Sequence, residues 1–105
     1  MAHVTRHAAK RTTQRLGLPK RVTEKNAEKA LKEGLQHKDT RGGLRRYLDA
    51  LYLKKETANN IRIYNNNVYI FNGETLITVF PLPQKYRKTV ERIKKGGRRN
   101  EEDAE

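Results

Sequence analysis

The chain has 105 residues, of which 24 are Lys or Arg and 12 are Asp or Glu, so its formal net charge is +12. It has no cysteine, which excludes disulfides, thiolate metal sites and cysteine nucleophiles. No apolar run reaches the length of a membrane span, and we expect a cytoplasmic protein without a membrane partner. The basic surplus favours a polyanionic partner, RNA first, because positive charge attracts phosphate groups and speeds their encounter.

Three helices are predicted in the first half of the chain, over about residues 5–16, 20–34 and 44–55. Thr5 is a typical N-cap, since its hydroxyl can accept a hydrogen bond from the first turn of a helix. Gly34 is a typical helix stop, because glycine adopts at little cost the backbone conformations that end a helix. The third helix has the clearest pattern, in which leucines recur one turn apart.

The period changes in the second half, where residues 61–64, 68–71 and 76–80 are short β-branched and aromatic runs separated by asparagine-rich and Asn-Gly turns. We therefore predict an α+β fold, with about three N-terminal helices packed on one face of a small antiparallel meander sheet of three to four strands. Residues 1–95 are expected to form a single domain and residues 96–105 a disordered, charged C-terminal tail.

The second face of the predicted sheet mixes aromatic side chains with Arg62 and Thr78. Aromatic rings and a guanidinium can hold a nucleotide by stacking on its base and contacting its phosphate. The basic segment 84–95, predicted as a short helix, can also cover this face, and the sequence leaves both arrangements open.

The first helix carries the sharpest chemical pattern, because His7, Arg11 and Arg15 follow one another at intervals of four residues and share one helix face. An imidazole titrates near neutrality, so it can exchange a proton with a ribose hydroxyl. Guanidiniums can clamp phosphate oxygens and stabilise the negative charge that develops on them. The same pattern fits an exposed helix face with an incidental histidine, so the sequence alone does not decide between the two interpretations.

Further basic residues cluster near glycines and aromatic residues. Tyr47 can offer a surface on which a base stacks, but an aromatic residue beside a leucine stripe also fits the core. The residues predicted to contact nucleic acid are Arg6, Lys10, Arg41, Arg45, Arg46, Arg62, Lys85, Arg87 and Lys88. His3 and His7 lie four residues apart without a third ligand nearby, so neither a metal nor another cofactor is predicted.

The run of residues 5–18, which contains His7-Ala8-Ala9-Lys10-Arg11, resembles the opening helix of small uncharacterised bacterial and phage domains. Those domains look related to the metal-independent ribonuclease superfamily that includes barnase, colicin D and RelE-type toxins. The closing strand over residues 76–83 is similar to theirs as well, and the likeness covers most of residues 3–83.

The resemblance implies a ribonuclease active site at His7 and Arg11, with Arg15 and Thr78 as further candidates. RelE-type toxins carry basic residues on central strands, whereas these strands offer Arg62 alone. The implied function is metal-free cleavage of RNA through the 2′-hydroxyl, by a protein encoded by a phage or mobile element. Its partners would be ribosome-associated RNA and an acidic inhibitor protein.

A second hypothesis is a non-catalytic protein of the same fold. It would either bind RNA or inhibit a host nucleoprotein, and it would need no proton-transfer residue. Affinity that falls steeply with salt and does not depend on His7 would distinguish this case.

Overall fold

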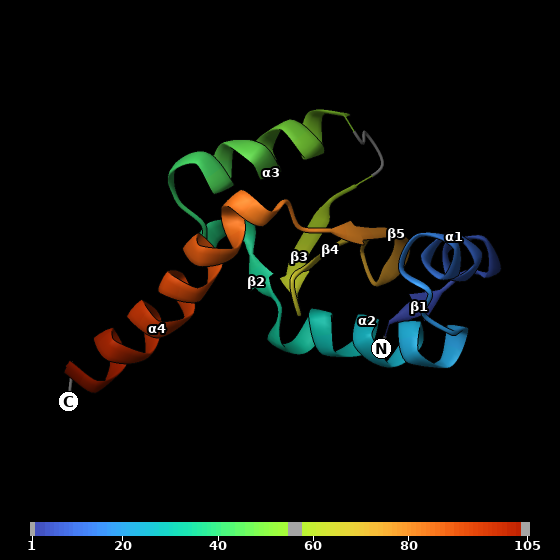
Figure 1. The fold of residues 1–105 in the computed structure, drawn as a ribbon, viewed down its shortest axis with the longest axis horizontal. Coiled ribbons are helices and arrows are strands. Elements are labelled where there is room, and N and C mark those ends of the chain that lie inside the picture. Colours follow the sequence, from blue (N-terminus) through green and yellow to red (C-terminus); the bar gives the residue numbers. More distant parts are fainter. Residues whose placement is uncertain (1, 55–57, 104–105) are drawn as a thin grey trace.

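The computed structural model describes residues 2–54 and 58–103. The α+β class is confirmed (Figure 1). In chain order the elements are β1 (His3–Val4), α1 (Arg6–Leu16), α2 (Lys20–Glu33), β2 (Leu35–Gln36), the 3-10 turn η1 (His37–Asp39), α3 (Gly42–Lys54), β3 (Asn60–Tyr64), β4 (Asn67–Asn72), β5 (Thr75–Pro81), the 3-10 turn η2 (Gln84–Tyr86) and α4 (Arg87–Asp103).

The strands form one mixed sheet in the order β1-β5-β4-β3-β2. Its centre is the antiparallel meander β3-β4-β5, joined by a turn in which Asn65 and Asn66 adopt positive φ and by a second turn at Gly73. Two short strands extend this meander: β1 pairs with β5 in parallel, and β2 pairs with β3 antiparallel. The prediction of a purely antiparallel sheet of three to four strands is corrected by these two additional edge strands.

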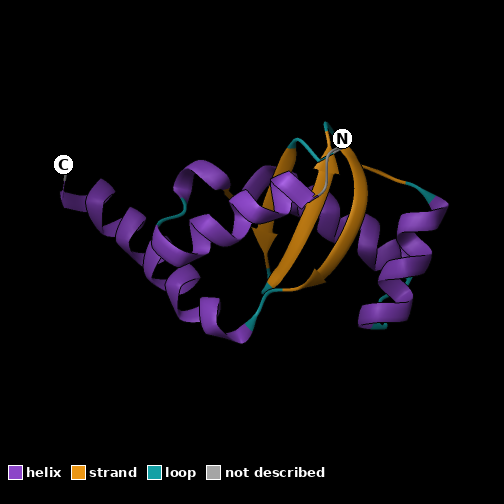
Figure 2. Ribbon diagram, turned by 90° about the horizontal axis from the view of Figure 1, so that it is seen from above, coloured by secondary structure: helices purple, strands orange, loops and turns teal. Residues whose placement is uncertain are grey.

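Helices cover both faces of the sheet, not one (Figures 1 and 2). Successive residues of β4 point in opposite directions and so feed two separate cores. Tyr69 and Phe71 pack against small alanines of α1 and α2, which let these helices approach closely. Val68 and Ile70 pack against leucines of α3 and against Val90 of α4. The aromatic face is therefore filled by α1 and α2, and it is not open to a nucleotide.

Local signals explain where the helices begin and end. The Thr5 hydroxyl accepts a hydrogen bond of 3.1 Å from the backbone N–H of Ala8, and Gly17 ends α1 in the left-handed conformation at φ 68°. The Gly34 N–H donates to the carbonyl of Ala30 at the end of α2. A Cβ on Gly34 would lie 2.4 Å from the Ala30 carbonyl oxygen, so glycine is required where β2 leaves the helix.

The last helix, α4, projects from the body of the fold toward the C-terminus (Figure 2), along a molecule that measures 44 × 27 × 24 Å. It runs from Arg87 to Asp103, so helical structure extends beyond the short helix that the sequence predicts over residues 84–95. The division into a domain at residues 1–95 and a disordered tail at residues 96–105 stays a prediction. None of the described helices is long and apolar enough to cross a membrane.

Candidate nucleic-acid interface

The α1 face predicted from the sequence is exposed: His7, Arg11 and Arg15 all lie at the surface. Nη1 of Arg15 donates a hydrogen bond of 2.9 Å to the hydroxyl of Thr78 on β5, 63 residues away in the chain. The structure thus brings together two of the four predicted active-site residues. The His7 imidazole has no hydrogen-bond partner among the residues that the structure describes, so nothing there orients it.

Thr78 is 2% exposed, so its hydroxyl is not accessible to a ligand. Its role is to accept the hydrogen bond that positions the Arg15 guanidinium. Arg15 has five N–H donors, and one bond to Thr78 leaves the others available to phosphate oxygens. The contact therefore restrains one cation of α1 at the edge of the sheet. A catalytic role for Arg15 and Thr78 stays a prediction.

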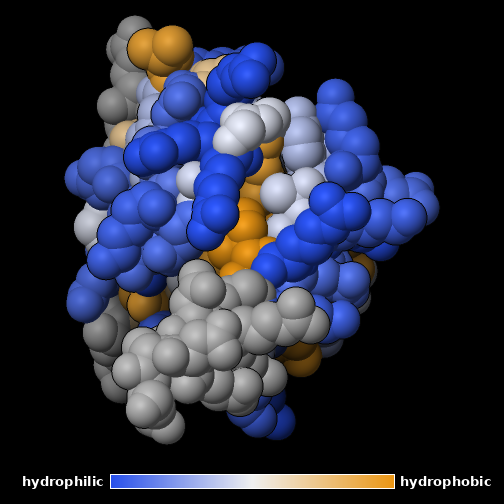
Figure 3. All heavy atoms as spheres, turned by 90° about the vertical axis from the view of Figure 1, so that its left-hand side faces the viewer, coloured by the Kyte–Doolittle hydropathy of each residue, from blue (hydrophilic) through white to orange (hydrophobic). Residues whose placement is uncertain are grey.

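A second basic surface forms where the start of α3 meets η2. The rings of Tyr47 and Tyr86 contact each other with centroids 4.9 Å apart, and Gly43 lies against Tyr86. This contact places the start of α3 next to η2 and the start of α4. The exposed cations of these neighbouring segments, which we call the basic corner, are Arg41, Arg45, Arg46, Lys85, Arg87 and Lys88. Figure 3 shows the side of the molecule from which α3 starts and α4 projects, where hydrophilic side chains surround a narrow strip of hydrophobic atoms.

Tyr47 packs beneath the exposed cations of the basic corner. It is half-buried and packs on the core between α3 and the sheet, while the Nζ of Lys85 lies 5.2 Å from the centroid of the Tyr86 ring. Of the two interpretations of Tyr47, the structure agrees with core packing. The Tyr47 ring helps to hold α3 against η2. The exposed cations around it are the groups that can contact a ligand.

Burial raises the pKa of Tyr47 above 10.0, and the nearby Tyr86 adds to the rise. Burial also raises the pKa of Tyr69, with a further contribution from Tyr64. Both phenols hold their protons more tightly in the folded chain than in the unfolded chain. Their contribution to stability is therefore fully present below pH 10 and is lost as the pH rises through the higher pKa of the folded state.

We expect the urea midpoint to be nearly constant from pH 8 to 9.5 and to fall above about pH 10. The Tyr47→Phe variant cannot ionise at this position, so it should lose less stability over the same range. Urea unfolding followed by circular dichroism at several pH values measures the difference. An equal loss in wild type and variant would contradict the assignment to Tyr47.

Arg62 is half-buried and links two elements of the fold. Its Nε donates to Asn60 at 2.8 Å, and its Nη1 donates to the carbonyl of Leu31 at 3.0 Å. Leu31 is in the last turn of α2, where carbonyls lack helical partners, so the guanidinium caps that helix and ties it to β3. Its predicted contact with nucleic acid stays a prediction, and the remaining donors of the guanidinium would have to supply it.

The two basic surfaces lie apart. Arg6, Lys10 and the other cations of α1 belong to one end of the molecule, whereas the basic corner lies at the other end, beyond the sheet (Figures 1 and 2). The helix α1 packs with α2 on one face of the sheet, and α3 packs with the start of α4 on the other face. A short polyanion would therefore occupy one of the two surfaces at a time.

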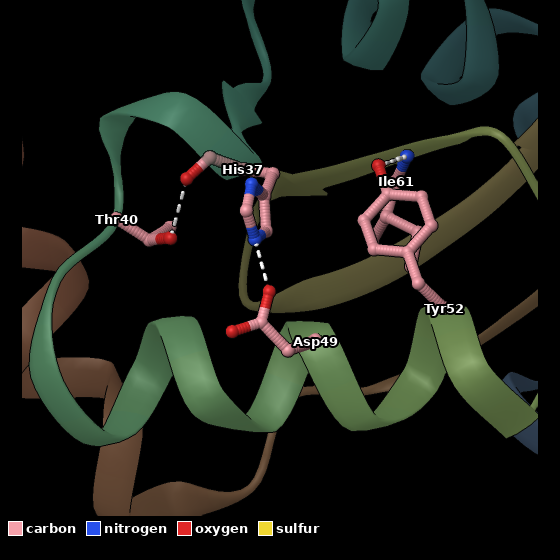
Figure 4. Close-up of polar contacts among 5 residues, drawn as sticks. All are labelled: His37, Thr40, Asp49, Tyr52 and Ile61. Atoms are coloured by element: carbon pink, nitrogen blue, oxygen red, sulfur yellow. Dashed lines mark hydrogen bonds and ion pairs between the residues drawn. The ribbon is translucent and has the colours of Figure 1, made fainter.

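The structure adds a polar cluster that the sequence analysis did not identify. Nε2 of His37 lies 2.5 Å from Oδ1 of Asp49, and the imidazole meets the edge of the Tyr52 ring with centroids 5.6 Å apart (Figure 4). The Tyr52 hydroxyl accepts a hydrogen bond of 2.9 Å from the N–H of Ile61. Thr40 donates to the carbonyl of His37 at 2.6 Å, which holds the η1 turn in place.

This cluster leaves only a weak signal in the sequence. His37 occurs in a polar loop, and Asp49 occurs on the polar side of a helix 12 residues later. Neither position belongs to a short motif, and only the packing of η1 on α3 brings them together. Within the described residues, no three side chains of His, Cys, Asp or Glu gather in a way that could hold a metal ion.

Comparisons of the chain with protein-family models, with curated proteins and with solved structures found no match. The resemblance to metal-independent ribonucleases therefore stays a prediction.

Proposed function

We infer that the protein binds RNA and that the basic corner is its main contact surface. The observation that carries this proposal is the Tyr47–Tyr86 contact, which holds the start of α3 against the segment after β5, so that exposed cations of both segments lie at the same end of the molecule. Arginine and lysine side chains grouped in this way match the repeated negative charge of a sugar-phosphate backbone. The choice of RNA over DNA rests on the resemblance of the first helix to metal-independent ribonucleases.

The charges of the basic corner are not neutralised within the described part of the chain. Arg41, Arg45 and Arg46 form no ion pair with a described carboxylate, and Asp49, on the same helix, is engaged by His37. Like charges held on one surface repel each other, and an anionic ligand relieves this repulsion. A polyanion with phosphates at regular spacing relieves it at several positions at once.

Fluorescence anisotropy with labelled single-stranded RNA, measured at several salt concentrations, tests the proposal. We expect affinity that falls steeply with salt, because each phosphate contact releases a counterion. Binding that is absent at low salt, or that does not depend on salt, would overturn the proposal. Pull-down from a host lysate before and after nuclease treatment then separates RNA binding from direct inhibition of a host nucleoprotein.

A second candidate function is metal-free cleavage of structured or ribosome-associated RNA at α1. The Arg15–Thr78 hydrogen bond favours it, since it places a restrained guanidinium on the helix face that also carries His7 and Arg11. In this proposal His7 accepts the proton of the 2′-hydroxyl, while Arg11 and Arg15 hold the scissile phosphate. An acidic inhibitor protein would bind the same face.

We expect His7→Gln to lower cleavage in the presence of EDTA by at least about a hundredfold if the chemistry takes place at α1. His3→Gln is the matched control, because His3 is also an exposed histidine near the N-terminus. Product analysis by gel electrophoresis, with a test for the 2′,3′-cyclic phosphate, measures the effect. Equal cleavage by wild type and His7→Gln would contradict the candidate.

A further inference from the structure

His37 is the one histidine of the described chain whose ring is held by other side chains. Asp49 binds one of its nitrogens, and Tyr52 packs against the ring at an interplanar angle of 86°. Figure 4 shows the imidazole above α3, on the side of the helix that carries both partners. This arrangement resembles the base-and-orienting-carboxylate pair that proton transfer requires, which His7 lacks.

The carboxylate determines which nitrogen is free to act. Since Asp49 accepts a hydrogen bond from Nε2–H, the neutral ring keeps its lone pair on Nδ1. None of the described residues forms a hydrogen bond with Nδ1, and none of their buried side-chain nitrogens or oxygens lacks a partner. Nδ1 therefore reaches solvent, which agrees with the 31% exposure of the His37 side chain.

Cations of the basic corner lie next to this pair. Arg45 precedes Asp49 by four residues on α3 and Arg46 precedes it by three, so both are neighbours of Asp49 on the helix surface. The N–H of Arg45 donates to the carbonyl of Arg41, which places Arg41 at the start of the same helix. A phosphate held by Arg45 or Arg46 would therefore lie beside the imidazole.

We propose that His37, oriented by Asp49, is the proton acceptor in metal-free cleavage of RNA bound at the basic corner. This inference rests on the proposed function, and it assigns the chemistry to the corner instead of α1. The substrate class is a ribonucleic acid phosphodiester with a free 2′-hydroxyl.

The step balances without an added reactant. The proton of the 2′-hydroxyl moves to Nδ1 of His37 as the 2′-oxygen forms a bond to phosphorus. The bond from phosphorus to the 5′-oxygen breaks, and this oxygen takes a proton from water. The products are a 2′,3′-cyclic phosphate and a 5′-hydroxyl, and the imidazolium returns its proton to solvent.

The other groups have distinct roles in this proposal. Asp49 is a positioning residue: it holds the ring and stabilises the imidazolium that forms, as a carboxylate does beside a general base. Arg45 offers N–H donors to the phosphate oxygens that gain charge in the transition state. Tyr52 fixes the plane of the ring, and its own hydroxyl is fixed by Ile61.

The experiment measures RNA binding and RNA cleavage with the same full-length proteins in EDTA. The probe is a labelled oligoribonucleotide, with its 2′-deoxy analogue as a chemical control. We expect wild type to cleave the oligoribonucleotide but not the analogue. His37→Gln should bind the RNA as wild type does and cleave it at least about a hundredfold more slowly. The Gln amide can still donate to Asp49, so the fold is expected to persist, and circular dichroism verifies this.

The role of Asp49 is tested by measuring kcat and KM separately for variants at this position. Asp49→Asn should lower kcat about tenfold or more and leave KM unchanged, and Asp49→Glu should restore part of kcat. A change in KM alone would overturn the positioning role, because it would indicate a contribution to binding only.

The outcomes separate this inference from the proposal of RNA binding. RNA that binds but stays intact with wild type overturns the inference and leaves RNA binding in place. RNA that does not bind at all overturns the proposed function. Cleavage that is lost in His7→Gln but kept in His37→Gln assigns the chemistry to α1 and overturns the role of His37.

Discussion

Replacement of Arg41, Arg45 and Arg46 together by Gln is expected to weaken binding to single-stranded RNA by roughly a hundredfold at about 0.1 M salt. Each lost phosphate contact removes the release of about 0.7 counterion from a single strand, so the slope of log K against log salt should become shallower by about 2. All three side chains are exposed, and none pairs with a described carboxylate. The fold should therefore be retained, and anisotropy at several salt concentrations measures both effects.

A charge-matched control distinguishes the basic corner from bulk charge. Lys20, Arg21 and Lys25 are exposed cations of α2, on the other face of the sheet, and their replacement by Gln removes the same three charges. We expect this variant to keep most of its affinity. Equal losses in the two triple variants would mean that net charge alone drives binding, which contradicts the basic corner.

Phe71→Ala is expected to lower the free energy of unfolding by about 3–5 kcal/mol, which is much of the stability of a small domain. Phe71 is 0% exposed and lies at the centre of the core that joins β4 to α1 and α2. Its ring is stacked along that of Tyr69, with centroids 6.5 Å apart, so its removal leaves a cavity between the sheet and the two helices. Urea unfolding followed by circular dichroism measures the loss.

Phe80→Ala is the matched control, since it deletes the same atoms from a half-buried position on β5. It leaves a smaller cavity and should cost about half as much. Similar losses for the two variants would contradict the placement of Phe71 in the closed core between the sheet and the first two helices.

Local sequence signals account for the parts of the fold that were predicted well. Thr5 and Gly34 mark helix ends because capping depends on a side chain or backbone conformation within a few residues. The Asn-rich and Asn-Gly turns mark the meander for the same reason, since they supply the positive φ that tight hairpins need. These features depend on short-range geometry, which a sequence displays directly.

Long-range packing accounts for what was missed. The strands β1 and β2 have two residues each, and they form only because β5 and β3 offer free edges to them. Alternation along β4 shows that the sheet has two faces, but it does not show which helices cover each face. Small alanines of α1 and α2 decide this, and their partners Tyr69 and Phe71 lie far away in the sequence.

The same distinction between local and long-range features applies to the candidate site. Spacing along a helix correctly groups His7, Arg11 and Arg15 on one exposed face, but it does not show that α1 and the basic corner lie at opposite ends of the fold. The contact between His37 and Asp49 depends on how η1 packs on α3. The sequence also does not show that the guanidinium of Arg62 ties α2 to β3, because its partner Leu31 lies 31 residues away.

Nuclear magnetic resonance titration of the labelled protein with a short single-stranded RNA tests the central claim most directly. We expect the largest amide shifts at residues 41–47 and 84–88, somewhat smaller shifts at His37 and its neighbours, and almost none in α1. Shifts confined to residues 6–16, with the basic corner unaffected, would contradict it.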